Sequence, residues 1–271
     1  MKALSANHYW RICAAGLSYI LFAIGGFLPG VYIFFLALLP ISKVKKQRKV
    51  RNAIQALCRF YVNLMQFLGL MTFEFQNQQG QTIRKQRIND KAGHMVISNH
   101  TMLIDALFVL AYVDNICCVV KASLCHNPFT RIPVKLAGYI SNEHDDLIDM
   151  AKVKLDAGEN VLIFPEGTRN QADLQLDFKR GASNMAVISQ APILPLVICC
   201  MPRALGKGEK WYQLPDVKSK IVIQFHPVLH INDCIDIEQS RTKQYRDLTA
   251  WLREYYLAAI AKVLAAKNAS T

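Results

Sequence analysis

Hydrophobic residues occur along this chain in short blocks that alternate with segments of helical periodicity. After residue 70, seven short runs have the length and composition of strands: 71–76, 94–98, 116–121, 138–141, 160–164, 193–200 and 220–225. Apolar residues repeat at helical spacing over four other segments: 102–113, 145–157, 181–189 and 239–266. This alternation predicts an α/β fold with a mixed, largely parallel sheet that is flanked by helices.

A longer apolar block lies near the N-terminus. Residues 12–41 include no charged residue, and about 20 apolar residues are enough to cross a bilayer as a helix. Because Pro29-Gly30 interrupts the block, it predicts either one kinked membrane helix or a hairpin that enters one leaflet. We therefore expect an N-terminal membrane-associated helical region over 1–70, with a further helix at 52–70. An α/β catalytic domain with a C-terminal amphipathic helix is expected over 71–271.

The charge of the chain also points to a membrane. The formal net charge is +12, and residues 43–51, directly after the apolar block, include six basic residues and no acidic one. Basic flanks of this kind mark the cytoplasmic side of a membrane and bind anionic head groups. No basic stretch is interleaved with aromatic residues, so no nucleic-acid partner is predicted. The predicted partner is a phospholipid membrane, and the predicted location is the cytoplasmic face of an inner or plasma membrane.

Two of the predicted strands end in polar sequences. The strand at 94–98 runs into Asn99-His100 and then Asp105, and the strand at 160–164 runs into "PEGTR", which ends at Arg169. Carboxyl ends of parallel strands meet at one edge of a sheet, where ligands bind, so we expect these residues and Glu166 in one cleft. Each motif also has a simpler interpretation, namely a loop hydrogen bond for the first and a turn with a surface salt bridge for the second.

In a strand-to-helix turn, Asp105 can accept a hydrogen bond from one imidazole nitrogen of His100 and leave the other nitrogen as a base. The sequence includes no Gly-x-Ser-x-Gly motif and places no cysteine beside the pair. A pair without a protein nucleophile is suited to removing the proton of a substrate hydroxyl, which then attacks directly. The eight cysteines form no CxxC motif, and we expect reduced, buried thiols and no zinc site.

Taken together, "NHTMLID" (99–105) and "FPEGTR" (164–169) resemble the signature blocks of the glycerolipid acyltransferases, the PlsC-like 1-acyl-sn-glycerol-3-phosphate acyltransferase family. Their order and separation along the chain also agree with that family. Three further stretches support the resemblance: Lys121 followed by Pro128, "FKRGA" at 178–182 and "ILPLVI" at 193–198.

The resemblance implies a membrane-bound O-acyltransferase of phospholipid biosynthesis. It would transfer a fatty acyl group from acyl-CoA or acyl carrier protein to a lysophospholipid, above all 1-acyl-sn-glycerol-3-phosphate, to give phosphatidic acid. The resemblance makes His100 the general base and Asp105 the residue that orients it. It implies five residues that bind the acceptor: Lys121, Glu166, Gly167, Thr168 and Arg169. Lys121 and Arg169 would bind the phosphate, and the Gly167 N–H would face the developing oxyanion. No metal or cofactor is implied, because the thioester is a co-substrate.

The chain departs from the family in the second block, which usually ends in a Gly-x-x-Phe-Ile-x-Arg pattern. Here "GYISNEHDD" (138–146) has no arginine and includes Glu143, Asp145 and Asp146. The departure motivates an alternative acceptor, either another lysolipid or a specialised lipid. A second alternative is a non-catalytic, membrane-anchored lipid-binding protein, which an intact His100 and Asp105 disfavour. A third is a metal hydrolase, for which no further cluster with ligand spacing is found.

Overall fold

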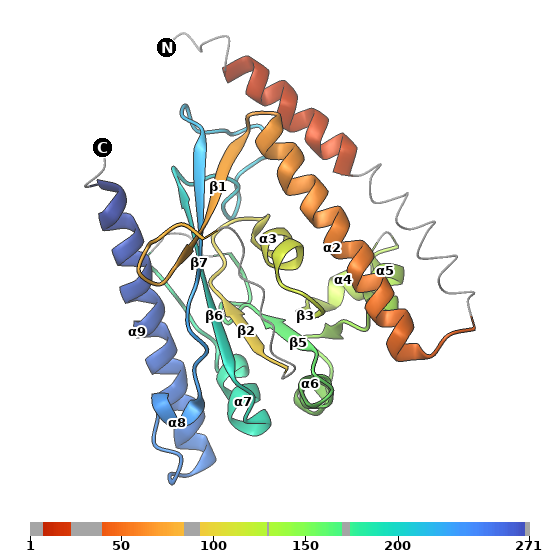
Figure 1. The fold of residues 1–271 in the computed structure, drawn as a ribbon, viewed down its shortest axis with the longest axis vertical. Helices are drawn as coiled ribbons and strands as arrows, with labels where there is room; N and C mark the ends of the chain where they lie inside the picture. Colours follow the sequence, from red (N-terminus) through yellow and green to blue (C-terminus); the bar gives the residue numbers. More distant parts are fainter. Residues whose placement is uncertain (1–7, 23–39, 84–92, 129, 170–173, 269–271) are drawn as a thin grey trace.

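The computed structural model describes residues 8–22, 40–83, 93–128, 130–169 and 174–268. A seven-stranded sheet forms its centre (Figure 1). The strands are β1 (Met71–Asn77), β2 (Met95–Ser98), β3 (Ile116–Val120), β4 (Ile140–Ser141), β5 (Asn160–Ile163), β6 (Ile193–Met201) and β7 (Ser219–Phe225). Their order is β1-β7-β6-β2-β5-β3-β4. The pair β6 and β7 is antiparallel, and the other described pairs are parallel. The predicted mixed, largely parallel sheet is confirmed.

Helices cover both faces of the sheet (Figure 1). One face packs against α2 (Lys43–Phe67) and α3 (Asp105–Tyr112), and the other against α6 (Leu147–Asp156), α7 (Arg180–Ser189) and α9 (Arg241–Asn268). Three short helices were not predicted: α4 (Ala122–His126), α5 (Arg131–Ala137) and α8 (Ile231–Cys234). Segments of four to seven residues are too short to display a helical period in the sequence.

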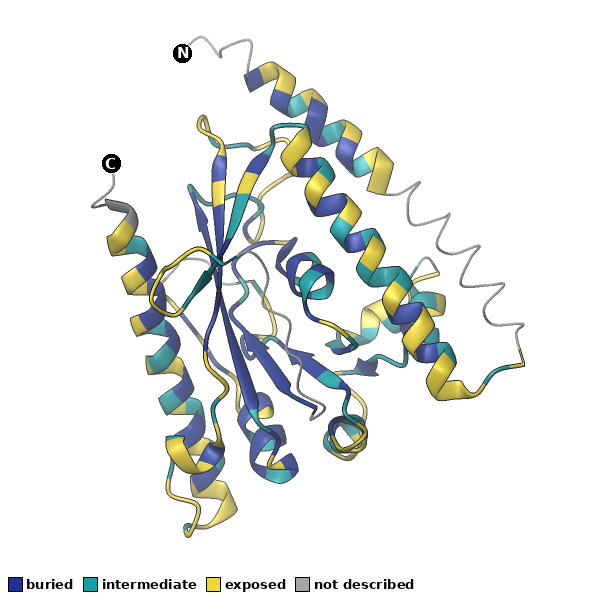
Figure 2. Cartoon of the chain, in the orientation of Figure 1, coloured by how far each residue is buried: buried dark blue, intermediate teal, exposed yellow. Residues whose placement is uncertain are grey.

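The core consists of two apolar clusters, one on each face of the sheet. In β2, Met95 and Ile97 point into the cluster beneath α7 and α9, whereas Val96 points into the cluster beneath α3. All four residues of β2 are buried, and the central strands are dark blue in Figure 2. A strand that is covered on both faces must be apolar at successive positions, which explains the continuous apolar runs of the sequence.

The N-terminal apolar block is only partly within the described residues. Residues 8–22 form a helix that runs alongside α2 (Figure 1). The Trp10 indole N–H donates to the Leu68 carbonyl at 3.3 Å, and the rings of Phe22 and Tyr61 lie 4.8 Å apart. None of the described helices has the length and apolarity that a membrane crossing requires. Most of the predicted membrane-embedded block, including Pro29-Gly30, lies outside the described residues. The choice between a kinked helix and a hairpin therefore stays a prediction.

The basic run at 43–51 forms the first turns of α2, so this helix begins nine residues before the predicted 52–70 segment. Arg51 is buried, and its guanidinium bonds the Ala137 carbonyl at 2.8 Å and the Glu159 carboxylate at 2.8 Å. Lys154 also lies 3.1 Å from Glu159. The prediction that the whole run binds head groups is therefore wrong for Arg51, because this residue fastens α2 to α5 and to the start of β5.

Candidate active site

Both polar motifs leave the sheet at the same edge. Val161 of β5 pairs with Met95 of β2 on one side and with Cys117 of β3 on the other, all in parallel. The turns that start at Asn99 and Pro165 therefore emerge side by side, about 4.8 Å apart at strand spacing. The register thus brings both motifs to the carboxyl edge of the sheet, where ligands of such sheets bind.

His100 and Asp105 meet in the turn between β2 and α3. The His100 Nδ1 atom lies 3.0 Å from Asp105 Oδ2. The same oxygen accepts the backbone N–H groups of Thr101 at 2.6 Å and Met102 at 2.7 Å. Oδ2 is thus an acceptor, so Nδ1 carries a hydrogen, and in the neutral imidazole Nε2 keeps its lone pair. Asp105 is fully buried, whereas the His100 side chain is 20% exposed, so the free nitrogen belongs to the residue that a substrate can reach.

Glu166 connects the second motif to the first. Its Oε1 accepts the backbone N–H of His100 at 2.8 Å, and the Phe164 ring stacks on the imidazole with centroids 4.5 Å apart. Glu166 is 4% exposed. The pKa of its carboxyl is raised to about 7, mainly by burial. The hydrogen bond from the His100 N–H opposes this rise, and the charge of Asp105 contributes to it. In this structure Glu166 therefore anchors the backbone that bears the candidate base.

Replacing Glu166 with glutamine should stabilise the protein at alkaline pH. A carboxyl whose pKa rises from 4.5 to about 7 on folding binds protons more tightly when folded. Its ionisation therefore lowers the free energy of unfolding as the pH rises through that window. E166Q keeps the oxygen that accepts from His100 and cannot ionise. We expect the Tm of E166Q relative to wild type to be higher at about pH 8 than at about pH 5. An equal difference at both values would contradict the raised pKa.

The Gly167 N–H has a partner within its own turn. It donates to the Phe164 carbonyl at 3.0 Å and closes the turn, in which Gly167 has a φ of 64°. This left-handed conformation favours glycine, so the residue is explained by the turn. The role of this N–H toward an oxyanion stays a prediction, and it would require the bond to Phe164 to be given up. Thr168 follows in the same turn and is exposed.

Arg169 also has a partner that the sequence did not predict. Its Nη1 donates to the carbonyls of Leu205 at 2.9 Å and Gly206 at 2.8 Å. The Leu205 carbonyl accepts the Leu103 N–H as well, at 3.1 Å, so one oxygen joins the two motifs. One end of the guanidinium fork is thus occupied by the loop after β6. The predicted phosphate contact would have to use its other nitrogens, Nε and Nη2.

Lys121 lies at the end of β3, where it is exposed and caps α4. Its neighbour Ala122 donates its N–H to the Asn142 side chain at 3.0 Å. The Asn142 side chain thus links the loop of the second block (138–146) to the residue after Lys121. This loop includes no arginine. The three acids of that loop are exposed, namely Glu143, Asp145 and Asp146. Lys121 and Arg169 leave neighbouring strands at the same edge, but no contact joins their described side chains.

Two residues that the sequence did not single out hold the strand end in place. The Asn99 side chain pairs with the backbone of Ile198, with both hydrogen bonds at 2.8 Å, and so extends the pairing of β2 with β6. The Tyr256 hydroxyl donates to the Ile97 carbonyl at 2.6 Å from a fully buried position. Asn99 is part of the quoted motif, whereas Tyr256 lies within the helix predicted over 239–266.

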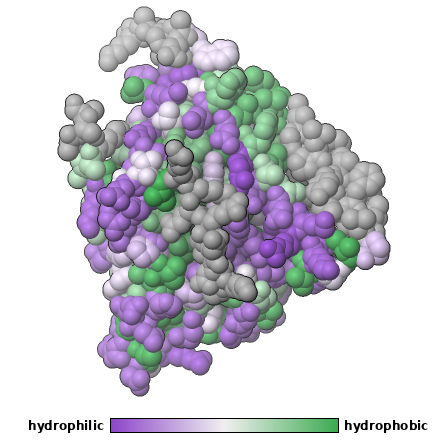
Figure 3. Space-filling model, viewed as in Figure 1, coloured by the Kyte–Doolittle hydropathy of each residue, from purple (hydrophilic) through white to green (hydrophobic). Residues whose placement is uncertain are grey.

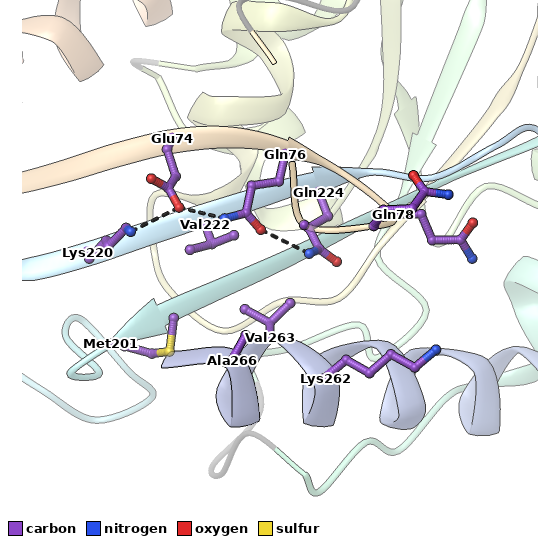
Figure 4. Close-up of a pocket in the computed structure, with 12 residues that line it drawn as sticks. Glu74, Gln76, Gln78, Met201, Lys220, Val222, Gln224, Lys262, Val263 and Ala266 are labelled. Carbon is purple, nitrogen blue, oxygen red and sulfur yellow. Dashed lines mark hydrogen bonds and ion pairs between the residues drawn. The ribbon is translucent and has the colours of Figure 1, made fainter. Parts of the chain in front are cut away.

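A polar groove of about 480 Å³ lies elsewhere, between the β1–β7 edge and the end of α9 (Figure 4). Glu74 pairs with Lys220 at 3.0 Å, and Gln76 bridges Glu74 and Gln224 through bonds of 2.6 and 3.0 Å. Lys262 of α9 faces this row of side chains (Figure 4). The groove is lined by a cross-strand polar network, and none of the predicted site residues is among its lining residues.

Comparison with known proteins gives consistent matches. The sequence model of the Acyltransferase family matches residues 79–199, which include both motifs. The chain is 28% identical over 179 residues to a 1-acyl-sn-glycerol-3-phosphate acyltransferase of Helicobacter pylori, covering 56% of this chain and 76% of that protein. It is 30% identical over 130 residues to 1-acyl-sn-glycerol-3-phosphate acyltransferase alpha of Mus musculus, covering 45% of this chain and 46% of that protein.

The region that includes both motifs thus matches the Acyltransferase family. The family model and the named relatives confirm the predicted resemblance to that family and the prediction of an O-acyltransferase. The crystal structure of the 1-acyl-sn-glycerophosphate acyltransferase PlsC from Thermotoga maritima matches with a TM-score of 0.66 at 18% identity, over 90% of this chain and 95% of that one. This likeness extends the agreement to the fold. The chain spans about half the length of the mouse acyltransferase.

Proposed function

We propose that this acyltransferase transfers a fatty acyl group from a thioester to the free hydroxyl of a lysophospholipid, with 1-acyl-sn-glycerol-3-phosphate as the acceptor and phosphatidic acid as the product. The observation that carries the proposal is the contact between His100 Nδ1 and Asp105 Oδ2 at 3.0 Å, at the edge where the Glu166 turn also emerges. The named relatives support the choice of acceptor. The donors proposed are acyl-CoA and acyl carrier protein.

The chemistry follows from the free imidazole nitrogen. Nε2 of His100 takes the proton of the acceptor hydroxyl as its oxygen attacks the thioester carbonyl. The C–S bond of the resulting tetrahedral intermediate then breaks, the thiolate leaves, and the imidazolium returns its proton to the sulfur. Asp105 stabilises the imidazolium and stays ionised. The base is aligned by three contacts: Asp105 on its side chain, Glu166 on its backbone and Phe164 on its ring face.

The acceptor's phosphate needs cations near this edge. Lys121 supports that role because it is exposed at the end of β3, two strands from the strand that bears His100. At about 4.8 Å per strand their backbones are about 10 Å apart, which is a distance that a lysine side chain and a glycerol phosphate can bridge together. The Nε and Nη2 atoms of Arg169 are the second proposed cationic contact.

Lys121→Ala should raise the KM for lysophosphatidic acid about tenfold and leave kcat within about twofold. A charge-assisted hydrogen bond is worth about 1.5–3 kcal/mol, and an exposed site favours the lower figure. Steady-state kinetics at saturating acyl-CoA would measure the effect. Lys152→Ala is the matched control, since Lys152 is a surface lysine paired with Asp156 on α6. An unchanged KM in K121A would contradict the phosphate role.

A different lysolipid acceptor is a second candidate, which the second block favours. Asn142 stands beside Lys121, and three exposed acids follow it, so this edge is less cationic than the family pattern implies. Initial rates with lysophosphatidic acid, lysophosphatidylethanolamine and lysophosphatidylglycerol would separate the two candidates. Selectivity for lysophosphatidic acid would support the first, and turnover of another lysolipid alone would support the second.

We also propose that the enzyme binds the surface of a phospholipid membrane, at the cytoplasmic face. Support comes from the exposed apolar side chains of the 8–22 helix, including Trp10 at 56% and Ile20 at 58% exposure, and from the basic residues of early α2. Amphipathic helices with aromatic and basic residues bind at membrane interfaces. Flotation with anionic vesicles tests the proposal, and Ile20→Asp should lower the bound fraction. Equal flotation of this variant would count against the helix as the contact.

A further inference from the structure

The loop after β6 lies against both polar motifs. β6 pairs in parallel with β2 but continues beyond the end of that strand, to Met201. The chain then folds back onto the site, because the Leu205 carbonyl accepts the N–H of Leu103 at 3.1 Å and the Nη1 of Arg169 at 2.9 Å. In the sheet, β6 neighbours β2 on the side away from β5 and β3. Residues 202–206 therefore lie on the opposite side of the site from Lys121.

This loop is held in a defined and unusual shape. Leu205 has a φ of 56°, in the left-handed region that residues other than glycine rarely adopt. The Gly206 carbonyl accepts from Arg169 at 2.8 Å, and the Gly206 N–H donates to the Glu209 carboxylate at 2.7 Å. Backbone conformations of this kind cluster at active and ligand sites. Arg203, just before this turn of the backbone, is thus carried by a preorganised segment.

Arg203 is half-buried in the loop, and its charge interacts with Glu166. Burial raises the pKa of the Glu166 carboxyl, and the positive charge of Arg203 is one of the effects that oppose the rise. Glu166 Oε1 in turn accepts the His100 N–H at 2.8 Å. A guanidinium has five N–H donors in a planar fork and can bond a protein group and a phosphate together. Arg203 is therefore placed to contact a ligand beside the candidate base.

Charge is distributed unevenly between the two sides of the site. On the β3 side, the loop of the second block (138–146) includes three acidic residues and no lysine or arginine. On the β6 side, the basic segment (203–210) includes three basic residues and one acidic residue. An anion between the two sides is attracted to the basic segment and repelled by the acids. The phosphate of an acceptor is therefore expected toward the β6 side.

The chain that follows the basic segment borders the surface at which a lipid would arrive. Arg11 of the 8–22 helix donates to the Pro215 carbonyl at 2.9 Å, and the rings of Tyr19 and Trp211 lie 5.9 Å apart. Figure 3 shows hydrophobic side chains gathered over this helix and the adjoining end of α2. A lipid held at a membrane surface presents its phosphate where lipid meets water, and basic segments next to a membrane attract such groups.

We propose that Arg203 binds the phosphate group of the acceptor and supplies the cation that the second block does not provide. The assignment rests on the proposed function and deepens it, because it names a residue that selects the acceptor. Lys121 would contact the phosphate from the β3 side and Arg203 from the β6 side, with His100 on the turn between them. A phosphate held in this way directs the neighbouring glycerol hydroxyl toward Nε2 of His100. Phosphomonoester and phosphodiester head groups both offer the oxygens that this contact requires.

Kinetics with two acceptors test the assignment. Arg203→Ala should raise the KM for lysophosphatidic acid at least about tenfold and leave kcat within about threefold, because the contact is a charge-assisted hydrogen bond made before and during transfer. Monoacylglycerol lacks the phosphate, so its kcat/KM should agree between R203A and wild type within about twofold. Arg203→Lys keeps the charge without the fork and should recover part of the loss. Arg246→Ala, which removes a surface arginine near Asp247 on α9, is the matched control and should resemble wild type with both acceptors.

A role of Arg203 through Glu166 alone would give a different pattern. In that case R203A would lower kcat equally with both acceptors, since Glu166 holds the backbone of the base whichever acceptor is bound. Equal losses of kcat, or an unchanged KM for lysophosphatidic acid, would overturn the assignment. Arg203→Gln keeps N–H donors and most of the bulk but removes the charge, and it gives the same comparison where the alanine variant fails to fold.

Binding without a thioester separates this inference from the proposed function. Calorimetric titration of the full chain would use octanoyl-lysophosphatidic acid, with octanoylglycerol as the probe that lacks phosphate. R203A should raise the Kd of the phosphate probe at least about tenfold and leave that of octanoylglycerol unchanged. This result in a protein without turnover would support the inference and count against the proposed function alone. Equal titrations of the phosphate probe for wild type and R203A, including no binding by either, would overturn the inference.

Discussion

Replacing His100 with alanine is expected to lower kcat for acyl transfer by about 10²–10⁴-fold, the usual contribution of a positioned general base. The imidazole is the group at this edge whose Nε2 is left with a lone pair by the contact to Asp105. The substitution should leave the fold intact, because the side chain is partly exposed and the backbone N–H that bonds Glu166 is kept. Single-turnover transfer from oleoyl-CoA to lysophosphatidic acid would measure the loss.

His126→Ala is the matched control for this substitution. His126 ends α4, is exposed and has no role in the proposed chemistry, so its loss should leave kcat within about twofold. Circular dichroism and vesicle flotation should be unchanged for both variants. Wild-type kcat in H100A would contradict the assignment of the base.

Asp105→Asn is expected to lower kcat nearly as far, by about 10²–10⁴-fold. One carboxylate oxygen accepts from His100 Nδ1 and from the N–H groups of Thr101 and Met102. An amide oxygen in its place carries no net charge, so it stabilises the imidazolium that forms during transfer far less than the carboxylate does. Asp105→Ala should in addition lower the free energy of unfolding by about 1–3 kcal/mol for each buried N–H that it orphans.

The double variant H100A/D105N provides the decisive comparison for this pair. Residues that act as one unit do not show additive losses, so kcat of the double variant should equal that of H100A within about twofold. Denaturant titration would follow stability separately from activity. A double variant with the product of both single losses would show that Asp105 acts independently of His100.

The strands and most long helices were predictable because buried parallel strands require continuous apolar runs and covered helices require a stripe. The meeting of His100 with Asp105 was also predictable, since both lie within one strand-to-helix turn. The contact of Glu166 with the His100 N–H depends on the register of β2 and β5. That register follows from the parallel pairing only once the strand order is known.

Other features depend on contacts between distant segments. Arg169 donates to the carbonyls of Leu205 and Gly206. Leu205 adopts a φ of 56° in this loop, and no local sequence pattern predicts the pairing. Arg51 was predicted to bind lipid with its basic neighbours, yet a single turn of helix directs it to buried Glu159. Charge runs predict an average environment, whereas helix geometry decides which of their members is buried.

We expect the purified protein to form phosphatidic acid from oleoyl-CoA and lysophosphatidic acid in vesicles, with one thiol released for each ester formed. The most direct measurement follows both products together for wild type and H100A. The predicted result is matched thiol and phosphatidic acid for wild type and neither above background for H100A. Thiol release without any ester, or ester formation that persists in H100A, would contradict acyl transfer by the His100 and Asp105 pair.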